Sequence, residues 1–369
     1  ISVLYHSIRI SNNLYIKGFK NCSRYKVKSL VNAPFARLFL CAKYCIFRES
    51  AYSANILCPV CVKWSDITKP PHMNKSALTI ALDWTPNTNH TGFFVAQGLG
   101  LYKDVGLNVR IIDPSTDNYA TTPAKKLELG EADFAIAPTE SAISLNTKNN
   151  PAAAVAIAAI LQDDVSAIAV LEDSDISRPA ELDGKSYASY GARYEDKIVQ
   201  QMIKNDGGKG ELKLDYPDKL GIWNTLLENK ADSTWIFQNW EGIEAETQGI
   251  KLRYFKLSDY DIPYGYSPVL LALKDNITPL QAEYRAFLQA TKKGFLHAQQ
   301  NPADAVELLK PHLPAPDRER IDLLRAQTFT NEHYGDAQSW GKMEPARLQR
   351  FVDWLKEHKI ENELQDISA

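Results

Sequence analysis

Cysteine is confined to one end of this 369-residue chain. All five cysteines lie between Cys22 and Cys61, so the rest of the chain has no thiol with which to form a disulfide, ligate a metal or attack a substrate. No segment reaches the roughly 18 consecutive apolar residues of a transmembrane helix, so we expect no membrane span. A net charge of −3 also lacks the basic excess typical of nucleic-acid-binding proteins, and we expect no nucleic acid as a partner.

Residues 1–72 differ sharply in charge from the remainder. They contain 11 Lys and Arg residues against two acidic ones, whereas residues 73–369 contain 31 basic and 43 acidic residues, a net charge of −12. This basic, cysteine-containing extension is compatible with an organelle transit peptide. We favour the interpretation that these residues are a mis-called upstream extension and that the protein begins at Met73. If Met73 is the true start, we expect a cytoplasmic protein. If a leader is missing, we expect a periplasmic or extracellular one.

Two cysteine pairs in this extension have spacings that permit a zinc site, Cys41-x3-Cys45 and Cys58-x2-Cys61. The residues between the pairs lack the turn and strand pattern of a zinc ribbon. We therefore assign no metal to the chain.

From Leu78 onward, short apolar runs alternate with longer helical patterns. The pattern predicts strands over 78–84, 107–113 and 132–138, and helices over 91–106, 120–131 and 139–149. Such alternation is typical of an α/β fold whose parallel sheet is covered by helices on both faces. Ligands of such sheets lie beyond the carboxyl ends of the strands.

The same alternation of predicted strands and helices begins again after residue 165. It predicts strands over 185–191, 211–217 and 231–237, helices over 193–208 and 221–230, and an extended return crossing over 252–275. We therefore predict a two-lobed α/β protein with the ligand cleft between the lobes. Lobe one comprises 77–165 plus 264–369 and lobe two comprises 166–263, so two chain crossings form a hinge that closes over a ligand.

The segment where the first predicted strand turns into the first helix is rich in side chains that bind ligands. It contains Asp83, Trp84, Asn87, Asn89 and His90, which offer a carboxylate, a flat stacking face, two amides and an imidazole. The alternative is a capped helix start with a core tryptophan. We favour ligand binding because capping alone rarely needs so many side-chain amides.

Two further strand ends carry polar candidates. Glu140 and Ser141 follow the third predicted strand, where a carboxylate either accepts two N–H donors from an amidine-like heterocycle or favours the dipole of the next helix. Tyr190, Arg193 and Glu195 follow the first strand of lobe two. There Arg193 either meets an anionic group or forms a solvated pair with Glu195.

Aromatic residues are concentrated on the lobe-two side of the cleft. Trp235, Asn239, Trp240 and Glu241 follow another predicted strand, and one of these tryptophans, opposite Trp84, would sandwich a planar ring. Tyr264 either lines the same cleft or packs at the hinge. No Ser-His-Asp order, P-loop or metal-binding helix is present, so we assign no catalytic residue and no cofactor.

Four segments resemble a known family, in order and at familiar spacings: "LDWTPNTNHTGFFVAQGLGLYKDVGLNV", "GEADFAIAPTESAIS", "LDGKSYASYGARYEDKIVQQM" and "STWIFQNWEG". The family is the thiamine-pyrimidine group, which includes transporter receptors for formylaminopyrimidine and the fungal thiamine-pyrimidine synthase. It lies within the type II periplasmic-binding-protein superfamily, beside sulfonate and nitrate receptors. The resemblance covers about 78–310.

The resemblance implies a pyrimidine ring stacked by Trp84, with its amino edge read by a carboxylate or amide. In the synthase branch, the protein consumes an active-site histidine, holds pyridoxal phosphate on a lysine four residues earlier, and binds iron at a cysteine-rich motif. Here Ser141 and Ala137 stand at the histidine and lysine positions. We therefore expect a binding protein for an aminopyrimidine. An ABC transporter permease is the further partner that the resemblance suggests.

Two alternatives stay open. One is an enzyme of thiamine-pyrimidine biosynthesis, which would need pyridoxal phosphate and iron and would use His90 with Glu140 or Glu195. The other is a sulfonate or nitrate receptor of an ABC transporter, for which Arg193 is the main cation of the predicted cleft.

Overall fold

The computed structural model describes residues 75–217 and 225–361. The predictions for residues 1–72, including both cysteine pairs, lie outside these residues, as does the start of the helix predicted over 221–230. Ten strands are described: β1 (Ala77–Ala81), β2 (Asn108–Ile112), β3 (Phe134–Ala137), β4 (Ala154–Ala159), β5 (Ser166–Leu171), β6 (Ser186–Ala188), β7 (Lys213–Asp215), β8 (Ser233–Phe237), β9 (Leu252–Phe255) and β10 (Val269–Leu273).

The α-helices that lie wholly within the described residues are α4 (Thr91–Gly98), α5 (Leu101–Asp104), α6 (Pro123–Glu128), α7 (Thr139–Asn146), α8 (Glu195–Asn205), α10 (Ile243–Thr247), α11 (Lys274–Ile277), α12 (Gln281–Gln300), α13 (Pro302–Leu309), α14 (Ala315–Arg320), α15 (Leu323–Asn331) and α16 (Pro345–Glu357). Shorter turns are η1 (Thr88–His90), η2 (Pro114–Asp117), η3 (Pro179–Leu182), η5 (Leu257–Tyr260), η6 (Lys310–His312) and the π-helical η4 (Gln238–Gly242). Within the described part of the chain, none of the helices has the length and apolar character to cross a bilayer.

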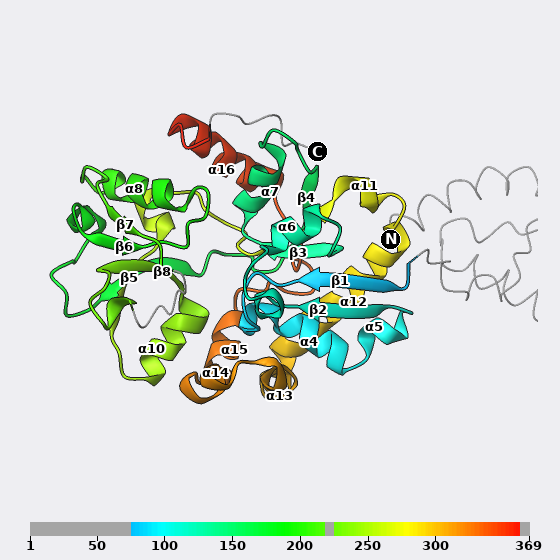
Figure 1. The fold of residues 1–369 in the computed structure, drawn as a ribbon. Helices are drawn as coiled ribbons and strands as arrows, with labels where there is room; N and C mark the ends of the chain where they lie inside the picture. Colours follow the sequence, from blue (N-terminus) through cyan, green and yellow to red (C-terminus); the bar gives the residue numbers. More distant parts are fainter. Residues whose placement is uncertain (1–74, 218–224, 362–369) are drawn as a thin grey trace, which may run out of the picture. The chain divides into compact units, whose positions relative to one another are not determined.

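The strands form two five-stranded sheets, visible as separate groups of arrows in Figure 1. The first sheet has the order β2-β1-β3-β10-β4, and the second has the order β7-β6-β8-β5-β9. Strands β2, β1 and β3 are parallel, as are β7, β6 and β8. The α/β fold class is therefore confirmed.

The expectation of wholly parallel sheets is wrong, because one strand in each sheet runs antiparallel. β10 is antiparallel to both β3 and β4, and β5 is antiparallel to both β8 and β9. The chain leaves the first sheet at the carboxyl end of β4, and Val269, which begins β10, pairs with Ala159 there. A strand that re-enters at the edge where its predecessor left must run in the opposite direction.

Alternation along β3 explains how the first sheet is buried on both faces. Phe134 and Ile136 point into a core formed with helices α4, α12 and α13. Ala135 and Ala137 point to the opposite face, where α6 and α7 cover the sheet. In Figure 1, α4 and α5 lie on one side of the first sheet and α6 and α7 lie on the other.

The helix predicted over 91–106 is divided in two. α4 ends at Gly98 and α5 begins at Leu101, with Gly100 between them at a φ of 73°. This is the left-handed region, which glycine adopts without a Cβ clash and which ends an α-helix.

The crossing 252–275 is also less extended than predicted. It contains β9, the turn η5, β10 and the short helix α11. Short irregular turns of this kind leave no helical period in the sequence.

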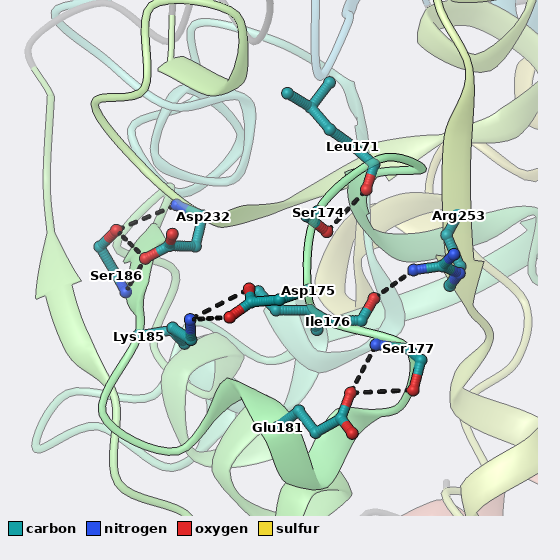
Figure 2. Close-up of polar contacts among 10 residues, drawn as sticks. All are labelled: Leu171, Ser174, Asp175, Ile176, Ser177, Glu181, Lys185, Ser186, Asp232 and Arg253. Atoms are coloured by element: carbon teal, nitrogen blue, oxygen red, sulfur yellow. Dashed lines mark hydrogen bonds and ion pairs between the residues drawn. The ribbon is translucent and has the colours of Figure 1, made fainter.

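Polar contacts hold the loop after β5 to the second sheet, as Figure 2 shows. Lys185, next to β6, donates to the carboxylate of Asp175 in this loop at 3.1 and 3.0 Å. Arg253, on β9, donates to the carbonyl oxygen of Ile176. These bonds involve none of the residues predicted to bind a ligand.

Candidate functional site

A pocket of about 200 Å³ lies where the carboxyl ends of β1, β3 and β8 converge. Its lining residues come from segments far apart in the sequence: Asp83, Trp84, Asn87, Asn89, Pro138, Glu140, Tyr190, Ala192, Glu195, Trp235, Phe237, Trp240, Glu241, Tyr264 and Ser267. Strand ends of both sheets contribute, so the pocket lies at the position where α/β sheets usually bind ligands.

The loop after β1 places a carboxyl group at the pocket and fixes it from behind. His90 Nε2 lies 2.7 Å from Asp83 Oδ1, and His90 Nδ1 accepts the backbone N–H of Asn87 at 3.2 Å. Because Nδ1 is an acceptor, the ring proton is on Nε2 and is donated to Asp83. His90 is fully buried and orients Asp83, and it does not itself reach the pocket.

Asn87 and Asn89 support the same loop. The Asn87 side chain caps η1 by accepting the backbone N–H of Asn89 at 2.9 Å. Asn89 Oδ1 accepts from Asn239 Nδ2 at 2.8 Å, and the same amide donates to Thr330 Oγ1 at 3.0 Å. A buried polar network therefore joins the loop after β1 to η4 and α15.

Glu140, on the first turn of α7, has one carboxyl oxygen without a partner. Its Oε1 accepts a hydrogen bond from the Tyr264 hydroxyl at 2.8 Å. Its Oε2 is buried and has no hydrogen-bond partner among the described residues. Burial raises the pKa of Glu140 to about 7, against the lowering effect of the Tyr264 bond. An unpaired buried carboxyl oxygen is costly unless something else bonds to it.

Glu241, on η4, is a second buried carboxyl group of the pocket. Its Oε2 accepts the backbone N–H of Phe237 at 3.0 Å. Burial raises its pKa to about 7 as well. Both groups are therefore able to donate or accept a hydrogen bond near neutral pH.

Glu195 is the third glutamate of the pocket, and its carboxyl group accepts more hydrogen bonds than those of Glu140 and Glu241. It accepts the Tyr187 hydroxyl at 2.7 Å, the backbone N–H of Tyr190 at 3.1 Å and that of Ala192 at 3.3 Å. Burial raises its pKa, and these hydrogen bonds act in the opposite direction.

Aromatic rings form the walls of the pocket. The Trp84 ring lies 6.0 Å from that of Tyr190 at an interplanar angle of 80°, and 5.7 Å from that of Tyr119. The Trp235 ring lies 5.6 Å from that of Tyr264. Edge contacts of this kind hold the rings in place while leaving faces for a planar ligand.

Eleven of the fifteen residues predicted from the sequence line this pocket: Asp83, Trp84, Asn87, Asn89, Glu140, Tyr190, Glu195, Trp235, Trp240, Glu241 and Tyr264. The other four, His90, Ser141, Arg193 and Asn239, are absent from the lining. His90 and Asn239 are buried behind it. Arg193 turns away and pairs with Glu361 at 2.7 Å.

Four lining residues were not predicted: Pro138, Ala192, Phe237 and Ser267. Pro138 directly follows β3 and Phe237 ends β8. Both residues lie at strand ends, as Glu140 and Asn239 do, but neither side chain is polar, so the sequence marks neither as a ligand-binding residue. Ala192 and Ser267 carry no comparable signal.

Comparison with known proteins identifies the family of the chain. The sequence model of the family described as "NMT1/THI5 like" matches residues 87–305. A formylaminopyrimidine-binding protein of Halalkalibacterium halodurans is 25% identical over 76% of this chain and 84% of its own length. A 4-amino-5-hydroxymethyl-2-methylpyrimidine phosphate synthase of Legionella pneumophila is 23% identical over 77% of this chain and 89% of its own.

Solved structures show the same fold. The ligand-binding component of an ABC-type import system from Staphylococcus aureus has a TM-score of 0.60 at 17% identity, covering 79% of this chain and 94% of its own. The periplasmic nitrate-binding protein of Synechocystis has a TM-score of 0.57 at 12% identity, covering 80% and 84%. The fold is therefore of the periplasmic-binding-protein type.

Proposed function

Because the chain belongs to the NMT1/THI5-like family, we propose that its pocket binds a small aminopyrimidine related to the precursors of thiamine. The proposal makes the protein a binding module, with an ABC transporter permease as the kind of partner that would receive the ligand. The chemistry of the lining supports this choice.

The observation that carries the proposal is the unpaired Oε2 of Glu140. An aminopyrimidine presents a ring nitrogen next to an exocyclic amino group, which is an acceptor beside a donor. A carboxyl group offers the complementary pair: its protonated oxygen donates and its other oxygen accepts. With its pKa raised to about 7 by burial, Glu140 is able to adopt this form near neutral pH.

The rings around Glu140 suit the rest of such a ligand. Trp84 and Trp235 line the same pocket and offer faces for a flat heterocycle. The cavity of about 200 Å³ suits a single small ring with short substituents.

An enzymatic role is less well supported. Pyridoxal phosphate requires a lysine for its covalent attachment, and none is among the lining residues of the described pocket. The described residues also contain no group of three or more His, Cys, Asp or Glu side chains fit to hold a metal ion. The side chains of the described part of the chain therefore do not fit either cofactor of the synthase branch, and we derive no reaction step from them.

The anion-receptor alternative is disfavoured by charge. Asp83, Glu140, Glu195 and Glu241 all line the pocket. Sulfonate and nitrate are recognised by cationic groups and N–H donors. A lining of this kind, with no Lys or Arg among its residues, offers these anions no cationic group.

The test is calorimetric titration of the full chain with 4-amino-5-hydroxymethyl-2-methylpyrimidine at neutral pH. We expect saturable binding that Glu140→Ala weakens about tenfold or more, since the variant loses two hydrogen bonds that contribute about 0.5–1.5 kcal/mol each. Glu211→Ala is the matched control, because Glu211 is exposed and lies outside the pocket lining. No heat and no thermal stabilisation with this pyrimidine or with formylaminopyrimidine would refute the proposal.

A further inference from the structure

The loop before α8 has the backbone geometry of an anion-binding site, but an internal carboxylate fills it. Gly191 has a φ of 69°, and the N–H groups of Tyr190 and Ala192 on either side of it point to the same carboxyl group. Free N–H groups at such a helix start bind phosphate in many α/β proteins. Here the two oxygens of Glu195 accept both of them.

Glu195 is also held in this position from the opposite side. The Tyr187 hydroxyl donates to its Oε1 at 2.7 Å, and the glutamate is only 6% exposed. Tyr187 is itself fully buried in the core of the second sheet. Hydrogen bonding and burial therefore hold the Glu195 carboxylate in a fixed position in the pocket wall.

The cation that would assist an anionic ligand is committed elsewhere. Arg193 pairs with Glu361 at 2.7 Å and donates to Thr147 Oγ1 at 2.8 Å. No Lys or Arg is among the lining residues of the described pocket. A phosphate, with a charge of about −1.5 to −2 at pH 7, would meet carboxyl groups and no counter-charge.

We infer that Glu195 is a specificity-determining residue that excludes phosphorylated ligands, so that the pocket selects the free aminopyrimidine over its phosphate ester. The inference rests on the proposed function and adds the charge class of the ligand to it. Glu195 occupies the place of a ligand phosphate, and it repels any phosphate that approaches.

The experiment compares two compounds that differ only in the phosphate. The full chain is titrated with 4-amino-5-hydroxymethyl-2-methylpyrimidine and with its phosphate ester at neutral pH. We expect the ester to bind at least about tenfold more weakly than the free pyrimidine.

Glu195→Gln tests the residue itself, because it removes the charge and keeps an oxygen acceptor of the same size. The preference for the free pyrimidine over its phosphate ester, expressed as the ratio of the two affinities, should fall by about fivefold or more in this variant. Glu211→Gln, which makes the same charge change on the surface outside the pocket, should leave the ratio unaltered. A thermal melt without ligand checks that each variant is folded. Were Glu195→Gln to unfold, the wild-type ratio would still decide the charge class.

The outcomes separate the two claims. Equal binding of both compounds, or tighter binding of the ester, would overturn this inference and leave the proposed function standing. An unaltered ratio in folded Glu195→Gln would overturn the role of Glu195. Binding of neither compound would remove the proposed function, and the inference would fall with it.

Discussion

The buried carboxyl groups of the pocket determine how individual residues respond to pH. Burial raises the pKa of Glu140 from its ordinary value of 4.5 to about 7. The folded protein therefore holds the proton more tightly than the unfolded chain does. By linkage, the contribution of Glu140 to stability is greatest below about pH 4.5 and is lost as the pH rises towards 7.

This direction of the pKa shift predicts how the stability of Glu140→Gln, relative to the wild type, depends on pH. At about pH 5, the variant and the wild type should have similar melting temperatures, because both side chains are neutral in the folded state. At about pH 8, the variant should be the more stable, because it avoids a buried charge. Thermal melts across this range measure the difference, and a difference that does not vary with pH would contradict the raised pKa.

The sequence predicted which residue types gather at the pocket better than it predicted their orientations. Asp83, Trp84 and Glu140 follow strands, and strand ends meet by topology alone. Arg193 was expected at the pocket, but it turns to Glu361, which is 168 positions away in the sequence. No local pattern encodes a partner at that distance.

At the scale of elements, the packing of α4 against α12 depends on two glycines. A Cβ atom on Gly294 would lie 2.0 Å from the carbonyl oxygen of Gly92, and one on Gly92 would lie 2.1 Å from the ring of Phe295. The two helices therefore approach to backbone contact beneath the loop that carries Asp83 and Trp84.

Gly294→Ala should therefore destabilise the protein by about 1–3 kcal/mol or more, because the backbone of one helix must move. Gln289→Ala, at an exposed position of the same helix, is the control and should alter stability little. Denaturant unfolding of both variants gives the comparison. Equal midpoints for Gly294→Ala and the wild type would show that the helices are not in close contact.

A second contact between elements joins the start of α8 to α7 and to the end of the described chain. Arg193 bonds to Thr147 and to Glu361, and the Tyr194 hydroxyl also donates to Glu361. Glu361 is 4% exposed, so its charge depends on these partners.

Arg193→Gln should lower the free energy of unfolding by about 1–3 kcal/mol, because it removes a charged hydrogen-bond donor from a buried carboxylate. The double variant with Glu361→Gln should recover part of this loss, since neither charge then remains. Denaturant unfolding of the two single variants and the double variant completes the cycle. Strictly additive effects would mean that the two residues do not interact.

The alternation of strands and helices could be predicted from the sequence. The direction of β10 and the break between α4 and α5 could not, for physical reasons. Parallel order follows from βα alternation in β2, β1 and β3. The direction of β10 depends on where the chain crosses between sheets, which the residues of β10 do not encode. The break at Gly98–Gly100 depends on one left-handed glycine, and helical periodicity alone continues across it.

At the scale of the whole molecule, two sheets supply the pocket from distant parts of the chain. The buried network through Asn89, Asn239 and Thr330 links these parts directly. A ligand that contacts residues after both β1 and β8 would form further contacts between the two sheets. Binding should therefore stabilise the folded state of both sheets together.

The most direct test of aminopyrimidine binding is native mass spectrometry of the full-length protein as purified, followed by gentle denaturation. We expect a small molecule that travels with the folded protein, leaves on unfolding, and has the mass of an unphosphorylated aminopyrimidine. A released sulfonate or a phosphate ester, or a cofactor covalently attached to a lysine, would contradict it.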